Sequence, residues 1–278
     1  MQDAFAYCAE LVRAADRDRF IASLFASGEK RGALHALYAF NAEVARVRDA
    51  AHAALPGEIR LQWWSDVIGG QRAEEARANP VASALLATID RFRLPAPQLT
   101  ELIEAHRFDL YDDPMATLTD LESYARKTSA ALIVLATQIL AGEGADAAAE
   151  PAGIAYGIAG LLRAFPIHLA RGQLYVPQEL LEHHEVHLHD LFAGRSSAGL
   201  TVALAELREL ARRHLAVARQ SVNALPAPAI PALLPVALVR PLLDRLEHSA
   251  PLTPVEFAPW RRQWLIWRAA RNPARITG

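Results

Sequence analysis

The chain has 278 residues, of which 52% are hydrophobic and 22% charged, and its formal net charge is −2 at pH 7. This mixture is typical of a folded globular protein and excludes a disordered chain. A net charge near zero creates no overall field for a polyanion, so we expect no nucleic-acid partner. The single cysteine, Cys8, excludes an internal disulfide and a zinc site built from several thiolates, and it fits a reducing compartment.

No targeting or membrane-spanning segment is predicted. The N-terminal residues include Asp3 and Glu10 and lack the basic and apolar regions of a signal peptide. The uncharged stretch 128–142 is too short to span a bilayer, and four prolines interrupt the stretch 220–239. We therefore expect a cytoplasmic protein, and a peripheral contact with the inner membrane stays open.

Apolar residues recur at helical spacing along the chain, and no segment alternates between apolar and polar residues as a half-buried strand does. Turn signals such as Pro56-Gly57, Asp113-Pro114 and Gly194 separate the helical segments. No repeat and no long linker divides the sequence. It predicts a single all-α domain, residues 1–278, with helices over about 3–15, 27–53, 57–69, 79–91, 97–111, 119–140, 148–170, 200–224, 232–248 and 254–270.

The helix predicted over 27–53, with Ser27 as a plausible cap, has two distinct faces. Its apolar stripe steps by three and four residues through Ala33, Leu37, Phe40, Val44 and Val47. The opposite face carries Tyr38, Asn41, Ala42, Ala45, Arg48, Asp49 and His52. By itself such a face is most simply a solvated polar surface.

The helix predicted over 148–170 carries a stripe of small residues. Gly153, Gly157, Gly160 and Ala164 lie on one side with His168, and Arg171 follows just beyond. Such a stripe usually indicates that two helices pack closely together. Neither of these two helix faces, taken alone, indicates a function.

Several short motifs follow one another along the chain. Tyr38-Ala39-Phe40 comes seven residues after Arg31, Asp109-Leu110 comes fifteen residues before Tyr124 with Thr117 between them, and Arg171-Gly172-Gln173-Leu174-Tyr175-Val176-Pro177 closes the series. In order and spacing these motifs resemble the squalene/phytoene synthase family, all-α enzymes that join two prenyl diphosphates head to head. The resemblance runs from about residue 18 to residue 248.

The resemblance implies an isoprenoid-synthase-like helical bundle around a central cavity, in which the helices bearing Asp49 and His168 face one another. It also implies where a prenyl substrate or another lipid would bind. The candidate substrate-binding residues are Arg31, Tyr38, Arg46, Asp49, Asp109, Tyr124, Arg163, His168 and Arg171.

The chain departs from the family in its metal-binding motifs. Active members carry an Asp-Asp-x-x-Asp and an Asp-x-x-x-Asp motif, whose carboxylates hold the Mg²⁺ ions that neutralise the diphosphates. The corresponding positions here, including the asparagine-bearing turn before the second motif, are Ala45, Arg46, Asp49, Gly160, Ala164 and His168. One of five aspartates remains, and a single acid is a poor anchor for a cluster of ions. We therefore predict no catalytic residues, no metal and no cofactor.

A degenerate branch of the same family fits the sequence better. The segment Phe40–Asp49, written Phe40-Asn41-Ala42-Glu43-Val44-Ala45-Arg46-Val47-Arg48-Asp49, resembles the matching helix of the mitochondrial complex I assembly factor, as do Gln62-Trp63-Trp64 and Leu162-Arg163-Ala164-Phe165-Pro166-Ile167-His168. This resemblance implies a non-catalytic role in assembling respiratory NADH dehydrogenase, with complex I subunits or assembly proteins as partners. Arg46, Arg163 and Arg171 would bind a diphosphate directly, without metal. The central cavity would still hold an isoprenoid or another lipid. The alternative is an active, Mg²⁺-dependent prenyltransferase that makes a squalene- or phytoene-like product.

Two further clusters have open interpretations. Four histidines fall within seven residues: His183, His184, His187 and His189. If the segment were helical, His183 and His187 would bind zinc at i, i+4 spacing. A polar surface segment is the simpler interpretation.

Near the C-terminus, Trp260, Trp264 and Trp267 share one helix face, and five arginines follow Pro259 without any acid. This helix would either contact an anionic membrane or a partner, or bury its tryptophans and expose its arginines. The sequence does not choose between these two arrangements.

Overall fold

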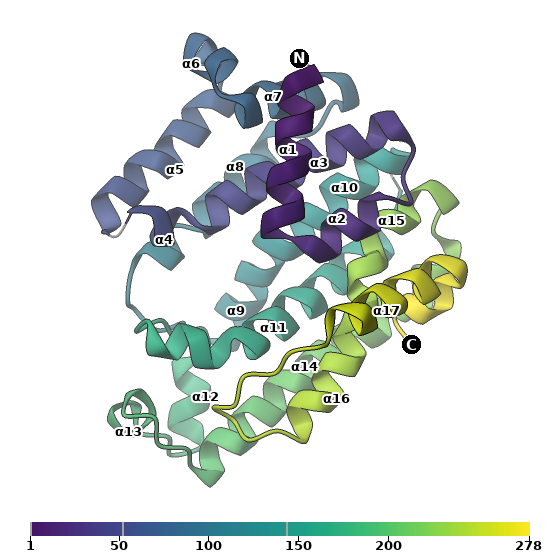
Figure 1. The fold of residues 1–278 in the computed structure, drawn as a ribbon. Helices are drawn as coiled ribbons and strands as arrows, with labels where there is room; N and C mark the ends of the chain where they lie inside the picture. Colours follow the sequence, from purple (N-terminus) through teal and green to yellow (C-terminus); the bar gives the residue numbers. More distant parts are fainter. Residues whose placement is uncertain (1, 52, 143) are drawn as a thin grey trace.

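The computed structural model describes residues 2–51, 53–142 and 144–278, so His52 of the predicted polar face lies outside the described residues. Every regular element among them is helical (Figure 1), which confirms the predicted all-α class. The α-helices are α1 (Gln2–Ala15), α2 (Arg17–Ser23), α3 (Gly28–Ala45), α4 (Val47–Ala51), α5 (Ala54–Ile68), α6 (Ala73–Ala78), α7 (Pro80–Phe92), α8 (Ala96–Ala105), α9 (Leu118–Ala125), α10 (Ala131–Ala141), α11 (Asp146–Ala170), α12 (Gln178–His183), α13 (Leu188–Phe192), α14 (Ala198–Ser221), α15 (Ile230–Leu233), α16 (Val239–Glu247) and α17 (Pro259–Arg271). Shorter helical turns are η1 (Phe108–Leu110), the π-helical turn η2 (Arg126–Ala130), η3 (Val222–Ala224), η4 (Ala227–Ala229), η5 (Leu234–Leu238) and η6 (Pro273–Ile276).

The predicted helices are present, but several are divided or shorter. The 27–53 helix breaks at Arg46, whose φ of −104° and ψ of 9° end α3 before α4 begins. The 232–248 segment becomes α15, η5 and α16, because Pro235 offers no backbone N–H for a continuous α-helix. The last helix begins only at Pro259, where a proline suits the first turn. The short helices α2, α6, α12 and α13 were not predicted, since each has at most seven residues and too few to show a period.

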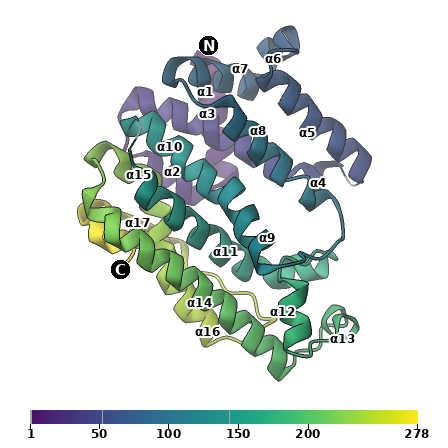
Figure 2. The same ribbon diagram turned by 180° about the vertical axis from the view of Figure 1, so that it is seen from behind.

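Helix α11 lies in the middle of the molecule (Figures 1 and 2). It packs mainly against α14 and also against η2, α10, α9 and α16. The small-residue stripe explains one of these contacts, because a Cβ at Gly153 would lie 2.3 Å from the Cα of Ala130 in η2. By length and composition α11 and the stretch 227–247 would suffice to cross a bilayer, but α11 is an interior element of this fold and residues 227–247 form four separate short helical pieces.

Helix α3 is enclosed on all sides along its middle. Its predicted apolar stripe is confirmed, since Leu37 and Phe40 have no exposed surface and Val44 almost none. The opposite face is not the solvated surface that the sequence suggested, because Tyr38 is also buried there, at 3% exposure. The first part of this face is therefore buried, where α3 packs against α2, whereas Ala45 and Asp49 further along it are exposed.

Candidate functional site

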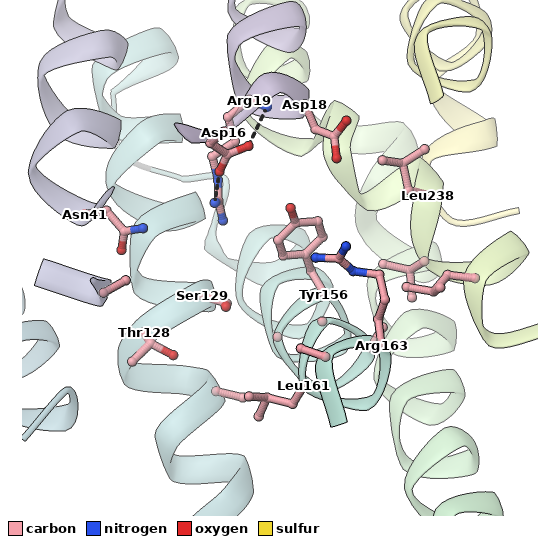
Figure 3. A pocket seen from close by; sticks show the side chains of 18 of the residues that line it. Asp16, Asp18, Arg19, Asn41, Thr128, Ser129, Tyr156, Leu161, Arg163 and Leu238 are labelled. Atoms are coloured by element: carbon pink, nitrogen blue, oxygen red, sulfur yellow. Dashed lines mark hydrogen bonds and ion pairs between the residues drawn. The ribbon is translucent and has the colours of Figure 1, made fainter. Parts of the chain in front are cut away.

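A cavity of about 560 Å³ opens between the α1–α2 turn, α3, η2, α11, α16 and the segment before α17. Figure 3 shows side chains from the α1–α2 turn, from η2 and from α11 pointing into it. Its volume lies within the range of small-molecule sites. The polar and charged residues that line it are Asp16, Arg17, Asp18, Arg19, Asn41, His106, Tyr124, Thr128, Ser129, Tyr156, Arg163, His168, Glu256 and Arg262.

Four of the six positions that correspond to the family's metal-binding motifs are in the wall of this cavity. Ala45 comes from α3, and Gly160, Ala164 and His168 follow one another at four-residue intervals along α11. None of these four side chains is a carboxylate, and no group of three His, Cys, Asp or Glu side chains suited to a metal occurs among the described residues. Since Mg²⁺ in proteins binds mainly through carboxylates and substrate phosphates, this wall does not fit a magnesium cluster.

Asp49, the one remaining acid of the two motifs, lies at the surface and already has a cationic partner. Its Oδ1 atom accepts a hydrogen bond of 2.9 Å from Nη1 of Arg171, and both side chains are about half exposed. This ion pair joins α4 to Arg171, the residue that caps the C-terminal end of α11 three residues beyond His168. It also reduces the charge that Asp49 could offer to a metal.

The charges that the cavity does contain come mainly from the turn between α1 and α2. Asp16 caps α2 by accepting from the backbone N–H of Arg19 at 3.0 Å, and it also pairs with the Arg19 guanidinium at 2.6 Å. This guanidinium lies over two tyrosine rings, 5.6 Å from the centroid of Tyr38 and 5.1 Å from that of Tyr156. Burial raises the pKa of Tyr156 to about 12, so the phenol stays protonated at neutral pH. Arg19 is thus a buried cation whose charge is balanced by Asp16 and whose guanidinium lies over two tyrosine rings.

Two more charged groups complete this side of the cavity. Asp18, at 5% exposure, accepts two hydrogen bonds from Arg262 of α17, one of them 2.9 Å from Nε. Arg163 reaches from α11 beside the ring of Tyr156 (Figure 3). Of these residues only Arg163 was a predicted site residue. The run of alternating charges Asp16-Arg17-Asp18-Arg19, directly after a helix end, is a local pattern that could have indicated these cavity residues. No local pattern indicates that Arg262 is the partner of Asp18.

A buried hydrogen-bond network adjoins the cavity around Asp109. Its carboxylate accepts from the hydroxyls of Tyr124 at 2.9 Å and Tyr175 at 2.7 Å, and it contacts Nδ1 of His106 at 2.6 Å. The ring of His168 lies 4.7 Å from that of Tyr175. The sequence-predicted residues Asp109, Tyr124 and His168 are therefore brought together, with Tyr175 and His106 as unpredicted members.

Both histidines of this group line the cavity and retain a free ring nitrogen. Nε2 of His106 and Nδ1 of His168 are buried without a hydrogen-bond partner among the described residues. Burial lowers the pKa of His168, so its ring is neutral at physiological pH. A neutral imidazole offers a ligand one hydrogen-bond donor or acceptor, but it is a weak ligand for Mg²⁺.

Besides the surface pair Asp49 and Arg171, two more predicted site residues lie away from the cavity. Arg31 donates to the backbone carbonyls of Ser23, Leu24 and Ala26, and so closes the C-terminal end of α2 instead of facing the cavity. Arg46 lines a second cavity, of about 510 Å³, on the other side of α3 together with Trp63 and Trp64. Arg46 therefore does not line the same cavity as Ala45, although both correspond to the first metal-binding motif, because its side chain leaves the end of α3 in a different direction.

The histidine cluster does not form a helical zinc site. His183 ends α12 and His187 precedes α13, and between them Glu185 adopts a left-handed φ of 53° that interrupts the helix. His184 instead contacts Glu206 of α14 at 2.7 Å. The i, i+4 geometry that zinc would need is therefore absent from this described segment.

Comparison with known proteins agrees with this arrangement. The squalene/phytoene synthase family model matches residues 12–268. The chain is 29% identical to NADH dehydrogenase (ubiquinone) complex I, assembly factor 6 of Rattus norvegicus, over 88% of this chain and 74% of that protein, and 29% identical to the protein of the same name from Homo sapiens, over 87% and 73%. It is 22% identical to the 15-cis-phytoene synthase of Synechococcus elongatus, over 90% and 85%.

Among solved structures, a dehydrosqualene synthase in complex with a ligand superposes with a TM-score of 0.81 at 18% identity, covering 97% of this chain and 96% of that one. This likeness confirms the predicted isoprenoid-synthase-like fold. The chain belongs to the squalene/phytoene synthase family.

Proposed function

We propose that this protein is a non-catalytic factor that assists the assembly of respiratory complex I, the NADH dehydrogenase. The observation that carries the proposal is the cavity wall of Ala45, Ala164 and His168, where an active synthase would need metal-binding acids. When a diphosphate leaves its substrate, negative charge develops on the diphosphate, and divalent cations normally neutralise that charge. Asp49, paired with Arg171 at the surface, cannot organise a cluster of ions alone. The similarity to complex I assembly factor 6 supports the same role.

Deletion of the gene in its native host tests this assignment. We expect lower NADH dehydrogenase activity and less fully assembled complex I on native gels, because a partner needed for assembly is missing. Carotenoid and hopanoid levels should stay unchanged. Normal complex I together with loss of squalene or phytoene would overturn the assignment and establish the alternative, a head-to-head prenyltransferase.

The retained cavity supports a second element of the proposal, the binding of an isoprenoid or another lipid with an anionic head. Arg163 supplies a cation at the cavity and forms no ion pair among the described residues. The neutral ring of His168 and the ring of His106 each supply a free nitrogen. Guanidinium groups pair well with phosphate oxygens without any metal. We place the protein in the cytoplasm, with its partners among complex I subunits or assembly proteins.

Charge reversal at Arg163 tests whether this residue contacts the head group of a bound lipid. Arg163→Glu would place a negative charge beside the proposed head group, so we expect less lipid to co-purify, measured by mass spectrometry of an organic extract. Arg46→Glu is the matched control, since Arg46 is also an exposed arginine but lies outside this cavity. An equal amount of bound lipid in wild type and Arg163→Glu would contradict the proposed head-group contact.

A further inference from the structure

Helix α17 exposes three tryptophans on one face. Trp260 is 69% exposed, Trp264 47% and Trp267 49%. At about 100° per residue these three side chains fall within one narrow sector. The other side of the helix buries Leu265, Ile266 and Ala269 against the body of the protein. The alternative left open by the sequence, a helix that buries its tryptophans, is therefore excluded.

Cationic groups are interleaved with these tryptophans. The guanidinium of Arg268 lies 4.6 Å from the ring centroid of Trp264, and that of Arg271 lies 5.2 Å from the ring of Trp267. Arg261 is exposed on the flank of the same face, and no acid follows Pro259 in the sequence. Arg262 has a different role, because it points inward and pairs with Asp18 in the cavity wall. The exposed face thus combines large aromatic surface with positive charge alone.

We propose that α17 is an interfacial helix through which the protein docks on an anionic lipid bilayer. Tryptophan favours the boundary between head groups and acyl chains, where its ring is partly apolar and its indole N–H remains solvated. Arginines around it attract anionic head groups. With 13 residues the helix is too short to span a bilayer and long enough to lie in its surface plane. The protein is a peripheral membrane protein at this face, whether or not its cavity holds a lipid.

The charge pattern favours a bilayer over a protein partner. A protein surface that matched this face would need acids placed opposite particular arginines, whereas a fluid anionic bilayer adjusts its head groups to any arrangement of cations. The three tryptophans are exposed on α17 beside arginines, and the helix itself carries no acid with which a protein partner's cations could pair. The composition of α17 is that of an amphipathic helix with aromatic residues and arginines at the membrane surface.

Co-sedimentation of the full chain with vesicles tests the proposal. Vesicles of phosphatidylcholine alone are compared with vesicles in which one third of the lipid is phosphatidylglycerol. We expect binding to the anionic vesicles that weakens as salt is added, because salt screens the arginines. The double variant Arg261→Glu/Arg271→Glu should bind at least about tenfold more weakly, since two attractive charges become repulsive. The triple variant Trp260→Ala/Trp264→Ala/Trp267→Ala should also lose binding to the anionic vesicles, because it no longer inserts aromatic rings at the bilayer surface.

A matched control comes from α5, where Leu55 is 72% exposed and Ile59 is 62% exposed. The variant Leu55→Ser/Ile59→Ser removes comparable exposed apolar surface far along the sequence from α17, and we expect it to bind vesicles as the wild type does. Thermal melting followed by circular dichroism checks that each variant is folded. Tryptophan fluorescence gives a second measure in the charge variant, which keeps all five tryptophans: the blue shift that vesicles cause in the wild type should be lost.

Two results would overturn the proposal. The first is wild-type protein that stays in the supernatant with both vesicle compositions. The second is equal vesicle binding by the wild type and the folded α17 variants. Loss of complex I association in those variants without loss of vesicle binding would assign the helix to a protein partner instead. Neither of the two vesicle results depends on the assembly role, which the gene deletion tests separately.

Discussion

Asp49 and Arg171 form an ion pair of 2.9 Å between α4 and the end of α11, at the place where the chain keeps its last motif acid. The neighbouring residue Arg48 makes a denser set of contacts across the same junction. It donates to the carbonyl oxygens of Asp109 at 3.0 Å and Tyr111 at 3.1 Å, and to the carboxylate of Asp112 at 2.6 Å. The junction is therefore held by hydrogen bonds from Arg48 more than by the Asp49 charge.

We expect Asp49→Ala to lower the free energy of unfolding by less than about 1 kcal/mol, because exposed ion pairs contribute little. Arg48→Ala should cost about 2 kcal/mol, since it removes several charge-assisted hydrogen bonds to backbone oxygens. Urea denaturation followed by circular dichroism measures both. An Asp49→Ala variant that is less stable than Arg48→Ala would show that the ion pair, not the carbonyl contacts, holds the junction.

Two glycines of α11 should respond in opposite directions to the same substitution. A Cβ at Gly153 would lie 2.3 Å from the Cα of Ala130, whereas a Cβ at Gly160 would have no atom within 4 Å. We expect Gly153→Ala to lower the free energy of unfolding by at least about 2 kcal/mol through displaced backbone. Gly160→Ala should raise it by up to about 1 kcal/mol through helix propensity. Thermal melting of both variants checks this, and a stabilising Gly153→Ala would contradict the close approach of α11 to η2.

The same stripe shows how far the sequence could predict the site. Glycines at helical spacing predicted a close helix contact, which is present at Gly153, but the contact ends before Gly160, where the stripe opens into the cavity. No local pattern marks that change, because it depends on where η2 passes. The Asp18–Arg262 contact joins residues 244 positions apart and is likewise invisible to periodicity.

Arg46 illustrates a second limit. Ala45 is the last residue of α3, and the backbone of Arg46 already departs from helical geometry. The sequence predicted one continuous helix over 27–53, so it gave no sign that the two side chains would line different cavities. The tryptophans of α17 illustrate a further limit: the helix has apolar residues on two faces, and only the surrounding fold decides that Leu265 and Ile266 are the buried ones.

His35 should make stability depend on pH in the mildly acidic range. Burial lowers its pKa from the usual 6.5 to about 4, and the Arg31 guanidinium adds to the effect. The unfolded chain takes up this proton near pH 6.5, whereas the folded protein takes it up only near pH 4. The contribution of His35 to stability is therefore complete above pH 6.5 and is lost as the pH falls towards 4.

Between about pH 7 and pH 5 this residue alone should lower the free energy of unfolding by about 2 kcal/mol. His35→Gln does not titrate and keeps a polar group near the Ser23 hydroxyl, which lies 2.8 Å from the His35 ring. Urea denaturation at both pH values should therefore show a flatter pH dependence in His35→Gln than in the wild type. Identical slopes would mean that His35 keeps an ordinary pKa in the folded protein.

The purified protein should not turn over prenyl diphosphates. With Mg²⁺ and farnesyl or geranylgeranyl diphosphate, we expect no release of pyrophosphate above background, because neutral Ala45, Ala164 and His168 line the wall where carboxylates would bind the ions. Restoring acids at these three positions, as Ala45→Asp/Ala164→Asp/His168→Asp, should increase the affinity for Mg²⁺ measured by calorimetry in the presence of the diphosphate. The matched control is Arg46→Asp, which adds an acid outside the cavity and should leave Mg²⁺ affinity unchanged. Steady product formation by the wild type that stops when a chelator is added would show that other residues hold the metal, and the protein would then be an active synthase.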